Sequence, residues 1–229
     1  MGLFSRLVGR RDLPPEDDPR GTSDPAAAAT PGSVYGTKAL RKFMAALTTR
    51  PDPVLLDLGP VIGANVSFFG EQLGCKIMVE DLFADVERHT REGTLDTLAE
   101  GFVRRLPQAD ESVDGILCWD LFDFLDSTAA QAVAAEVSRV LRAEGALLGF
   151  FSTAPIRETT FTKFVVVDEG SLRHRPYGPV RTRSRVLQNR DIIKLFEGLR
   201  VSDSFLLQTN LREIVFRRPA YLTGARQDA

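Results

Sequence analysis

The feature that most constrains the fold is the way its pattern of alternating strands and helices ends, near the carboxyl terminus, in two strand-like runs with no helix between them. From residue 54 onward, short apolar runs alternate with amphipathic helical stretches, as in repeated βα units. The last two strand-like runs, 200–208 and 212–217, are separated by only a few residues. A gap of that length cannot hold a crossover helix, so the two runs must pair antiparallel. The sequence therefore predicts a Rossmann-like, doubly wound α/β sheet, mostly parallel, with a terminal antiparallel hairpin.

Four apolar runs supply the predicted parallel strands, at 54–58, 76–80, 113–119 and 146–151. Helices are expected between them, one of them capped by Ser127, and a last helix is capped by Asn189. The stretch 94–105 contains no convincing strand. A dinucleotide-binding Rossmann half would continue with another βα unit, so the antiparallel ending argues against a nicotinamide dehydrogenase.

Composition divides the chain into a tail and one domain. Residues 1–33 hold five prolines, an acidic run and an alanine run, which cannot bury enough apolar surface to offset chain entropy. We expect this segment to be a disordered tail that folding does not need. The α/β domain is expected over 34–229, beginning with a helix whose apolar stripe is Leu40, Phe43, Met44 and Leu47.

Charge and cysteine content exclude several classes of protein. The net charge is −2, so no global positive field draws the chain to nucleic acid, and nucleic-acid binding is not expected. No apolar stretch approaches the roughly 20 residues of a membrane-spanning helix. Two cysteines, Cys75 and Cys118, exclude a disulfide framework, and the two histidines lack partners at metal-ligand spacing. The sequence predicts a soluble cytoplasmic protein without a metal site.

A β-hairpin arm is predicted at about 152–190, inserted after the last parallel strand. From residue 173 to residue 190 there are six arginines and no acidic residue. Arg173, Arg175 and Arg181 are the candidate substrate-binding residues, because such a cluster can bind a carboxylate or phosphate. The alternatives are that the arginines bind RNA backbone or that they only face water.

Three segments resemble class I S-adenosylmethionine-dependent methyltransferases of the small-molecule type, over roughly residues 34–219. VLLDLGPVIGANV is similar to the glycine loop that follows the family's first strand. LPQADESVDGILCWDLFDFLD is similar to its run into strand four, and EVSRVLRAEGALLGFF to its turn into strand five. The matching residues are Asp57, Gly59, Gly63, Leu106, Pro107, Asp110, Ser112, Asp114, Arg139, Val140, Leu141 and Gly145.

The resemblance implies a cofactor site for S-adenosyl-L-methionine. Asp57, Gly59 and Gly63 would form the turn that brings bare backbone amides to the ligand, with Val61 in place of the family's middle glycine. The spacing differs from that of a pyrophosphate-binding loop. Alternatively, both glycines only make a tight βα turn.

Four more residues at strand ends are candidate cofactor-binding groups. Glu80 or Asp81 would accept hydrogen bonds from the ribose hydroxyls, and the register allows either; the other would cap the next helix. Trp119 and Asp120 end strand four, although a buried tryptophan is commonly part of a core. The family's adenine contact has no clear counterpart here.

The resemblance implies an enzyme that transfers a methyl group from S-adenosyl-L-methionine to an unidentified small molecule, which the arginines suggest is anionic. The sulfonium already carries an activated methyl group, so positioning is the main requirement and the catalytic residues remain unassigned. The alternative is a non-catalytic member of the fold that acts as a binding or scaffold protein, favoured by Val61 and by the missing adenine contact.

Overall fold

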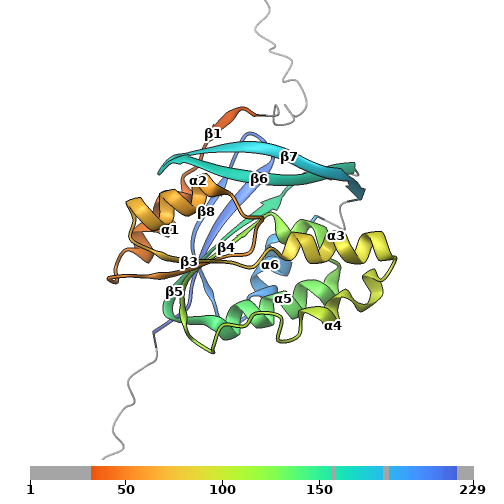
Figure 1. Cartoon of the computed structure of the whole chain (residues 1–229), viewed down its shortest axis with the longest axis horizontal. Helices are drawn as coiled ribbons and strands as arrows, with labels where there is room; N and C mark the ends of the chain where they lie inside the picture. Colours follow the sequence, from red (N-terminus) through yellow and green to blue (C-terminus); the bar gives the residue numbers. More distant parts are fainter. Residues whose placement is uncertain (1–31, 156–157, 183–185, 221–229) are drawn as a thin grey trace, which may run out of the picture.

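The computed structural model describes residues 32–155, 158–182 and 186–220. Its centre is a six-stranded sheet with the order β3-β2-β4-β5-β9-β8 (Figure 1). The strands are β2 (Val54–Asp57), β3 (Lys76–Val79), β4 (Val113–Trp119), β5 (Leu141–Ser152), β8 (Arg200–Leu206) and β9 (Leu211–Arg217). The first four are parallel, and β9 is antiparallel to both β5 and β8. The predicted fold class, including the terminal antiparallel hairpin, is confirmed.

Helices cover both faces of this sheet. They are α1 (Ala39–Leu47), α2 (Gly63–Ser67), the π-helical turn η1 (Phe68–Gln72), α3 (Leu82–Glu92), the 3₁₀ turn η2 (Leu95–Thr97), α4 (Leu98–Phe102), the 3₁₀ turn η3 (Leu121–Phe124), α5 (Ser127–Val140) and α6 (Asn189–Leu195). As expected, the stretch 94–105 adds no strand to the sheet; it is helical over η2 and α4.

The alternation of side chains along the strands creates two cores. Leu56 and Ile116 pack with α3, α4, α5 and α6, whereas Leu55 and Leu117 pack with α1 and η1 on the other face. Gly115 lets α1 approach closely, because a Cβ atom there would lie 2.8 Å from Leu47 Cδ1 and 2.9 Å from Phe43 Cζ. The doubly wound arrangement thus follows from the buried apolar runs.

Two predicted helix caps are displaced by one residue. The side chain of Asp126, not Ser127, accepts a hydrogen bond from the N–H of Ala129 at the start of α5. Gln188 precedes α6 in place of Asn189, and its side chain makes no capping bond. Asp126 is the stronger cap because a carboxylate also complements the positive end of the helix dipole.

The arm forms a second sheet, with the order β1-β7-β6. Strands β6 (Glu158–Asp168) and β7 (Ser171–Thr182) make the predicted hairpin, and β1 (Val34–Gly36), which the sequence did not predict, pairs with β7. Figure 1 shows this sheet lying across one edge of the central sheet. The proposed tail, residues 1–33, falls outside the described residues except for its last two.

Within the described residues, no helix is long and apolar enough to cross a membrane. Cys75 and Cys118 are both buried free thiols.

Candidate functional site

The carboxyl ends of β2, β3 and β4 meet at the edge of the sheet that the arm covers. Because these strands are parallel, they bring Asp57 at the end of β2 and Trp119 at the end of β4 to the same edge as the residues that follow β3. Three of the predicted cofactor residues, Asp57, Gly59 and Trp119, are in direct contact. The other predicted cofactor residues lie at the same edge but make separate contacts. They are Gly63, Glu80, Asp81 and Asp120.

Asp57 is the centre of this contact. Its side chain is buried, and Oδ1 accepts hydrogen bonds from the N–H of Gly59 at 2.8 Å and from Nε1–H of Trp119 at 2.7 Å. Burial raises the pKa of Asp57 from 3.8 to about 6, although both hydrogen bonds act against the shift and nearby Asp81 adds to it. Asp57 is therefore an acid tuned close to neutral pH.

The two loop glycines have different reasons for being glycine. A Cβ atom on Gly59 would lie 2.7 Å from Cδ1 and 2.9 Å from Nε1 of Trp119, so only glycine fits beneath the indole ring. Gly63 begins α2 and is exposed, and a Cβ atom added there would meet no other atom within 4 Å. The space around Gly63 is open, and the space above Gly59 is filled.

Trp119 is part of an aromatic cluster. Its ring stacks on Phe164 of β6, with centroids 5.4 Å apart and planes at 9°, and meets Phe150 of β5 edge-on. Only 2% of Trp119 is exposed, and its backbone is left-handed, with φ of 50°. The structure places Trp119 at the carboxyl end of β4, packed into the core against the arm, and its contact with a cofactor stays a prediction.

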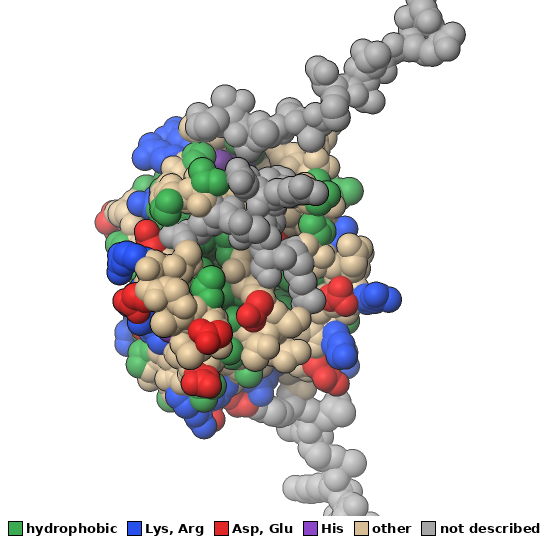
Figure 2. All heavy atoms as spheres, turned by 90° about the vertical axis from the view of Figure 1, so that its right-hand side faces the viewer, with side chains coloured by type: hydrophobic (Ala, Val, Ile, Leu, Met, Phe, Trp, Pro, Cys, Tyr) green, Lys and Arg blue, Asp and Glu red, His purple; other side chains and the backbone are tan. Residues whose placement is uncertain are grey.

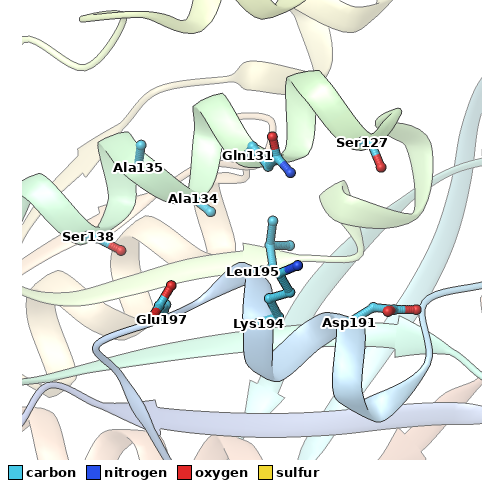
Figure 3. A pocket seen from close by; sticks show the side chains of 9 residues that line it. All are labelled: Ser127, Gln131, Ala134, Ala135, Ser138, Asp191, Lys194, Leu195 and Glu197. Atoms are coloured by element: carbon cyan, nitrogen blue, oxygen red, sulfur yellow. The ribbon is translucent and has the colours of Figure 1, made fainter.

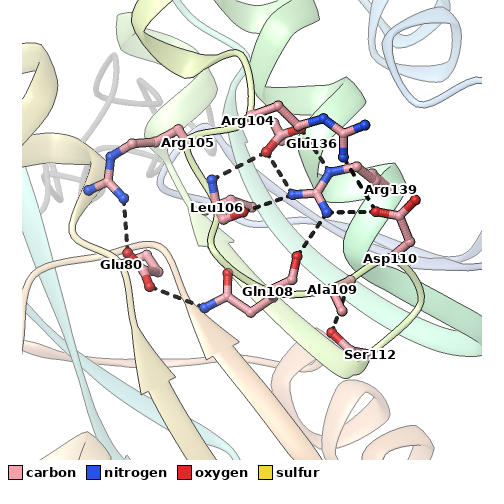
Figure 4. A network of polar contacts seen from close by, with 10 residues as sticks. All are labelled: Glu80, Arg104, Arg105, Leu106, Gln108, Ala109, Asp110, Ser112, Glu136 and Arg139. Carbon is pink, nitrogen blue, oxygen red and sulfur yellow. Dashed lines mark hydrogen bonds and ion pairs between the residues drawn. The ribbon is translucent and has the colours of Figure 1, made fainter.

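Glu80 and Asp81 have separate roles, and Figure 4 shows the partners of Glu80. Glu80 Oε2 accepts from Arg105 Nη1 at 2.9 Å, and Oε1 accepts from Gln108 Nε2 at 3.1 Å. Asp81 Oδ1 caps α3 by accepting from the N–H of Ala84. The two alternatives that the sequence left open are thus unequal: each oxygen of Glu80 already has a protein donor.

Asp81 interacts electrostatically with Asp57 of the β2 turn and with Lys163 of the arm. Burial raises its pKa, and the ammonium of Lys163 on the arm acts in the opposite direction. Asp81 also raises the pKa of Asp57, so the two carboxyls are close enough to interact. Asp81 therefore lies between the β2 turn and the arm.

Asp120 begins the short turn after β4 and is buried. Asp123, which the sequence did not single out, is completely buried and accepts from the N–H of Ser152 at 3.3 Å and 3.1 Å through its two oxygens. This contact joins η3 to the point where β5 leads into the arm. Asp123 thereby holds the base of the arm near the site.

The predicted substrate arginines lie on β7. Arg173 is half-buried and Arg175 is exposed, and the pairing of β7 with β6 sets Arg173 opposite Val165 and Arg175 opposite Lys163. Paired residues share a face of a sheet, so Arg175 and Lys163 lie on one face. The side chain of Arg181 falls outside the described residues.

Besides Asp123, the sequence reasoning missed Asn65, and it did not predict the burial of His174. Asn65 of α2 is 1% exposed and hydrogen-bonds the backbone of β6, where Phe164 covers Trp119 and Lys163 faces Asp81. The available signal was Asn65 itself, a polar residue in an apolar helical stripe. His174, one of the two histidines that lack a partner at metal-ligand spacing, is buried between Tyr35 and Phe164, and burial lowers its pKa to about 4.

Arg139 explains why two of the recognised segments occur together (Figure 4). Its guanidinium donates to the carbonyls of Leu106 and Gln108 and to the carboxylates of Asp110 and Glu136. The run before β4 is thereby fixed to α5. These matching residues have a structural role.

A surface hollow of about 520 Å³ lies between α5 and α6, lined in part by Gln131, Asp191 and Lys194 (Figure 3). It includes none of the predicted site residues.

In residues 32–155, 158–182 and 186–220, no group of three or more histidine, cysteine or acidic side chains could hold a metal ion. Figure 2 shows acidic and basic side chains interspersed on one face of the molecule.

The strand order and the turn after β2 define a mostly parallel, doubly wound α/β protein. The family described as "Methyltransferase domain" matches residues 56–149, a segment that contains every predicted cofactor residue. The predicted resemblance to class I S-adenosylmethionine-dependent methyltransferases is confirmed over this segment. S-adenosyl-L-methionine, the predicted cofactor, is the one that this family uses.

Several solved structures are similar to this chain. One is 1,6-didemethyltoxoflavin-N1-methyltransferase of Burkholderia thailandensis, solved with 1,6-didemethyltoxoflavin and S-adenosylhomocysteine bound. The two sequences are 17% identical, the match covers 79% of this chain and 78% of that chain, and the TM-score is 0.45. Another is a SAM-dependent methyltransferase of Aquifex aeolicus: 14% identity, 78% and 89% covered, TM-score 0.44. A third is geranyl diphosphate C-methyltransferase of Streptomyces coelicolor: 11% identity, 79% and 75% covered, TM-score 0.46. No curated protein matches the chain.

The residues near Gly63 and Asp81 fit this cofactor, whereas the packing of Trp119 over Gly59 does not. The open backbone at Gly63 and the carboxylate of Asp81 suit an amino-acid group and a ribose. The indole of Trp119 fills the space over Gly59 that a ligand approaching this turn needs. A ligand can therefore reach Gly63 directly, but it can reach Gly59 only if the indole ring of Trp119 moves.

Proposed function

We propose that this protein transfers a methyl group from S-adenosyl-L-methionine to a small anionic acceptor. The observation that carries the proposal is the coincidence of the family match, residues 56–149, with the Asp57, Gly59 and Gly63 turn at the carboxyl edge of the sheet. The bound cofactor supplies an activated methyl group, so this chain has to bind, orient and exclude water.

The cofactor is held by the residues that follow β2 and β3. The turn at Gly63 receives the amino-acid end, and Asp81 accepts from the ribose hydroxyls. Asp81 also caps α3 through Oδ1, but we choose it over Glu80 because Gln108 and the charged Arg105 donate to both oxygens of Glu80, whereas the donors to Asp81 are backbone N–H groups. Asp120 lies next to this edge, at the end of β4, and completes the cofactor side of the site.

The acceptor binds on the arm side. Lys163 and Arg175 share one face of the arm, Arg173 lies on the same face two residues away, and Tyr177 lies beneath the Lys163 ammonium at 4.9 Å. Cations beside an aromatic ring suit a small acceptor with a carboxylate or phosphate group. We include Arg181 of β7 in this group.

The test is a transfer assay with S-adenosylmethionine labelled in its methyl group, offered to pairs of acceptors that differ only in a carboxylate or phosphate. We expect label in the anionic member of a pair and less in its neutral analogue. Equal labelling of both members would show that the acceptor need not be anionic.

A second candidate function is favoured by the packing of Trp119 over Gly59. A protein whose cofactor edge is permanently filled by its own side chains would be a non-catalytic binding or scaffold protein. Absence of S-adenosylhomocysteine binding, both in the parent and in a variant that loosens the arm, would favour this alternative.

A further inference from the structure

Trp119 stands where a ligand would reach the backbone of the β2 turn. Cδ1 of the indole would lie 2.7 Å from a Cβ atom on Gly59, and Nε1–H already donates to Asp57. A ligand group that contacts the Gly59 backbone from this side has to displace the ring.

The ring is held in place by the arm. Phe164 of β6 stacks on one face of Trp119, with centroids 5.4 Å apart. Phe164 also meets His174 of β7 edge-on, and His174 packs against Tyr35 of β1. Trp119 therefore cannot leave Gly59 without a matching movement of Phe164.

Asn65 ties this arm to the glycine turn. Its Nδ2 donates to the carbonyl of Phe164 at 2.9 Å, and its Oδ1 accepts from the N–H of Val166 at 2.8 Å. Asn65 lies two residues after Gly63, in α2, which Figure 1 shows beside β6. We call these two hydrogen bonds the Asn65 latch.

The backbone of Trp119 is suited to a second position. It is left-handed, with φ of 50°, and the pairing of β4 with β5 shifts register between Leu117 and Trp119. Tryptophan rarely adopts this conformation, which persists where surrounding contacts impose it. Releasing those contacts allows the end of β4 to relax.

We propose that Trp119 and Phe164 form a gate over the β2 turn, and that the Asn65 latch sets how readily the gate opens for a ligand. The identity of that ligand as S-adenosylmethionine rests on the proposed function. The gate itself is a property of the arm and can be measured without ligand.

The fluorescence of Trp119 reports directly on the gate, because it is the sole tryptophan of the chain. We compare quenching by acrylamide in the parent, in Asn65→Ala and in Asn65→Asp, which keeps the acceptor for Val166 and loses the donor to Phe164. Quenching should increase in the order parent, Asn65→Asp, Asn65→Ala. Val133→Ala, a buried change in α5 away from the arm, is the control for general destabilisation and should resemble the parent.

The same variants are then titrated with S-adenosylhomocysteine. A closed gate reduces apparent affinity by the fraction of open molecules, so Asn65→Ala should bind about tenfold more tightly than the parent. In the parent, the ligand should increase the exposure of Trp119 to acrylamide.

The outcomes separate the gate from the proposed function. Equal quenching in the parent and in both folded Asn65 variants would overturn the gate, whatever binds. Greater quenching in Asn65→Ala with no binding of S-adenosylhomocysteine by any variant would support the gate and reject the proposed cofactor. If Asn65→Ala does not fold, Asn65→Asp provides the same comparison.

Discussion

The two ends of the proposed cofactor edge are closed by different kinds of contact. At β2 and β4 the closure is aromatic and buried: Trp119 lies over Gly59 and under Phe164. At β3 it is ionic and partly exposed, with Arg105 and Gln108 on Glu80. Packed rings have to move together, whereas a partly exposed polar edge can take up a ligand without repacking. Access to the first end therefore needs a conformational change, and access to the second, at Asp81, does not.

The largest expected effect is at Gly59. Gly59→Ala places a methyl group against the indole of Trp119, and overpacking of this kind should lower the free energy of unfolding by about 3 kcal/mol. Gly63→Ala is the matched control and should leave stability almost unchanged, because the space there is open. Urea denaturation measures both variants.

A smaller ring should rescue the first variant. In the double variant Gly59→Ala, Trp119→Phe, the combined stability loss should be smaller than the sum of the two separate losses. Strict additivity would show that the indole does not set the requirement for glycine at position 59.

The next effect is a pair of opposing pH dependences within the aromatic end. The pKa of Asp57 is 3.8 when exposed and about 6 in the folded chain, so between these values the folded state holds the extra proton. Its contribution to the free energy of unfolding should therefore fall by about 2–3 kcal/mol as the pH rises from 4 to 6. The pKa of His174 is 6.5 when exposed and about 4 when folded, so its contribution rises over the same range.

Single variants should expose each contribution. Asp57→Asn should become more stable relative to the parent as the pH rises from 4 to 6, and His174→Phe should become less stable relative to the parent over the same range. Denaturation at a series of pH values measures both differences. Parallel pH profiles for the parent and Asp57→Asn would contradict the buried, proton-holding Asp57.

The ionic end should show a smaller difference in ligand binding. Asp81→Asn should weaken binding of S-adenosylhomocysteine about tenfold, the loss of one charged hydrogen bond, while Glu80→Gln should change it little. Calorimetric titration of both variants gives the comparison. A larger loss in Glu80→Gln would reverse our assignment of the ribose ligand.

The smallest expected effect lies on the arm, where the charges are exposed. Replacing Arg173, Arg175 and Arg181 together by methionine should raise the KM for an anionic acceptor about fivefold, since exposed ion pairs contribute up to about 1 kcal/mol each. The affinity for S-adenosylhomocysteine should stay within about twofold of the parent value, because the cofactor contacts come from other strands. Unchanged KM across a salt series would mean that these cations only face water.

Hydrophobic periodicity predicted the strands of the sheet, because each strand is an apolar run that has to be buried. The runs at 54–58 and 113–119 became neighbouring parallel strands, and the short gap before 212–217 forced the antiparallel end. The caps at Ser127 and Asn189 were one residue off, since several polar residues near a helix start can compete for the same backbone donors.

The sequence predicted only those site residues whose position follows from the end of a strand. Asp57, Asp81 and Trp119 share an edge because parallel strands do. Nothing in the local sequence indicates that Phe164, which is distant from Trp119 along the chain, stacks on it, or that Asn65 binds the backbone of β6. Contacts of this range depend on how the arm folds back, which side-chain periodicity does not encode.

The most direct test of a cofactor site at this edge is calorimetric titration of the full chain with S-adenosylhomocysteine, with NAD as the control ligand. We predict saturable binding of one S-adenosylhomocysteine per chain, tighter in Asn65→Ala, and no heat of binding with NAD. No binding of S-adenosylhomocysteine by the parent or by Asn65→Ala would contradict such a site.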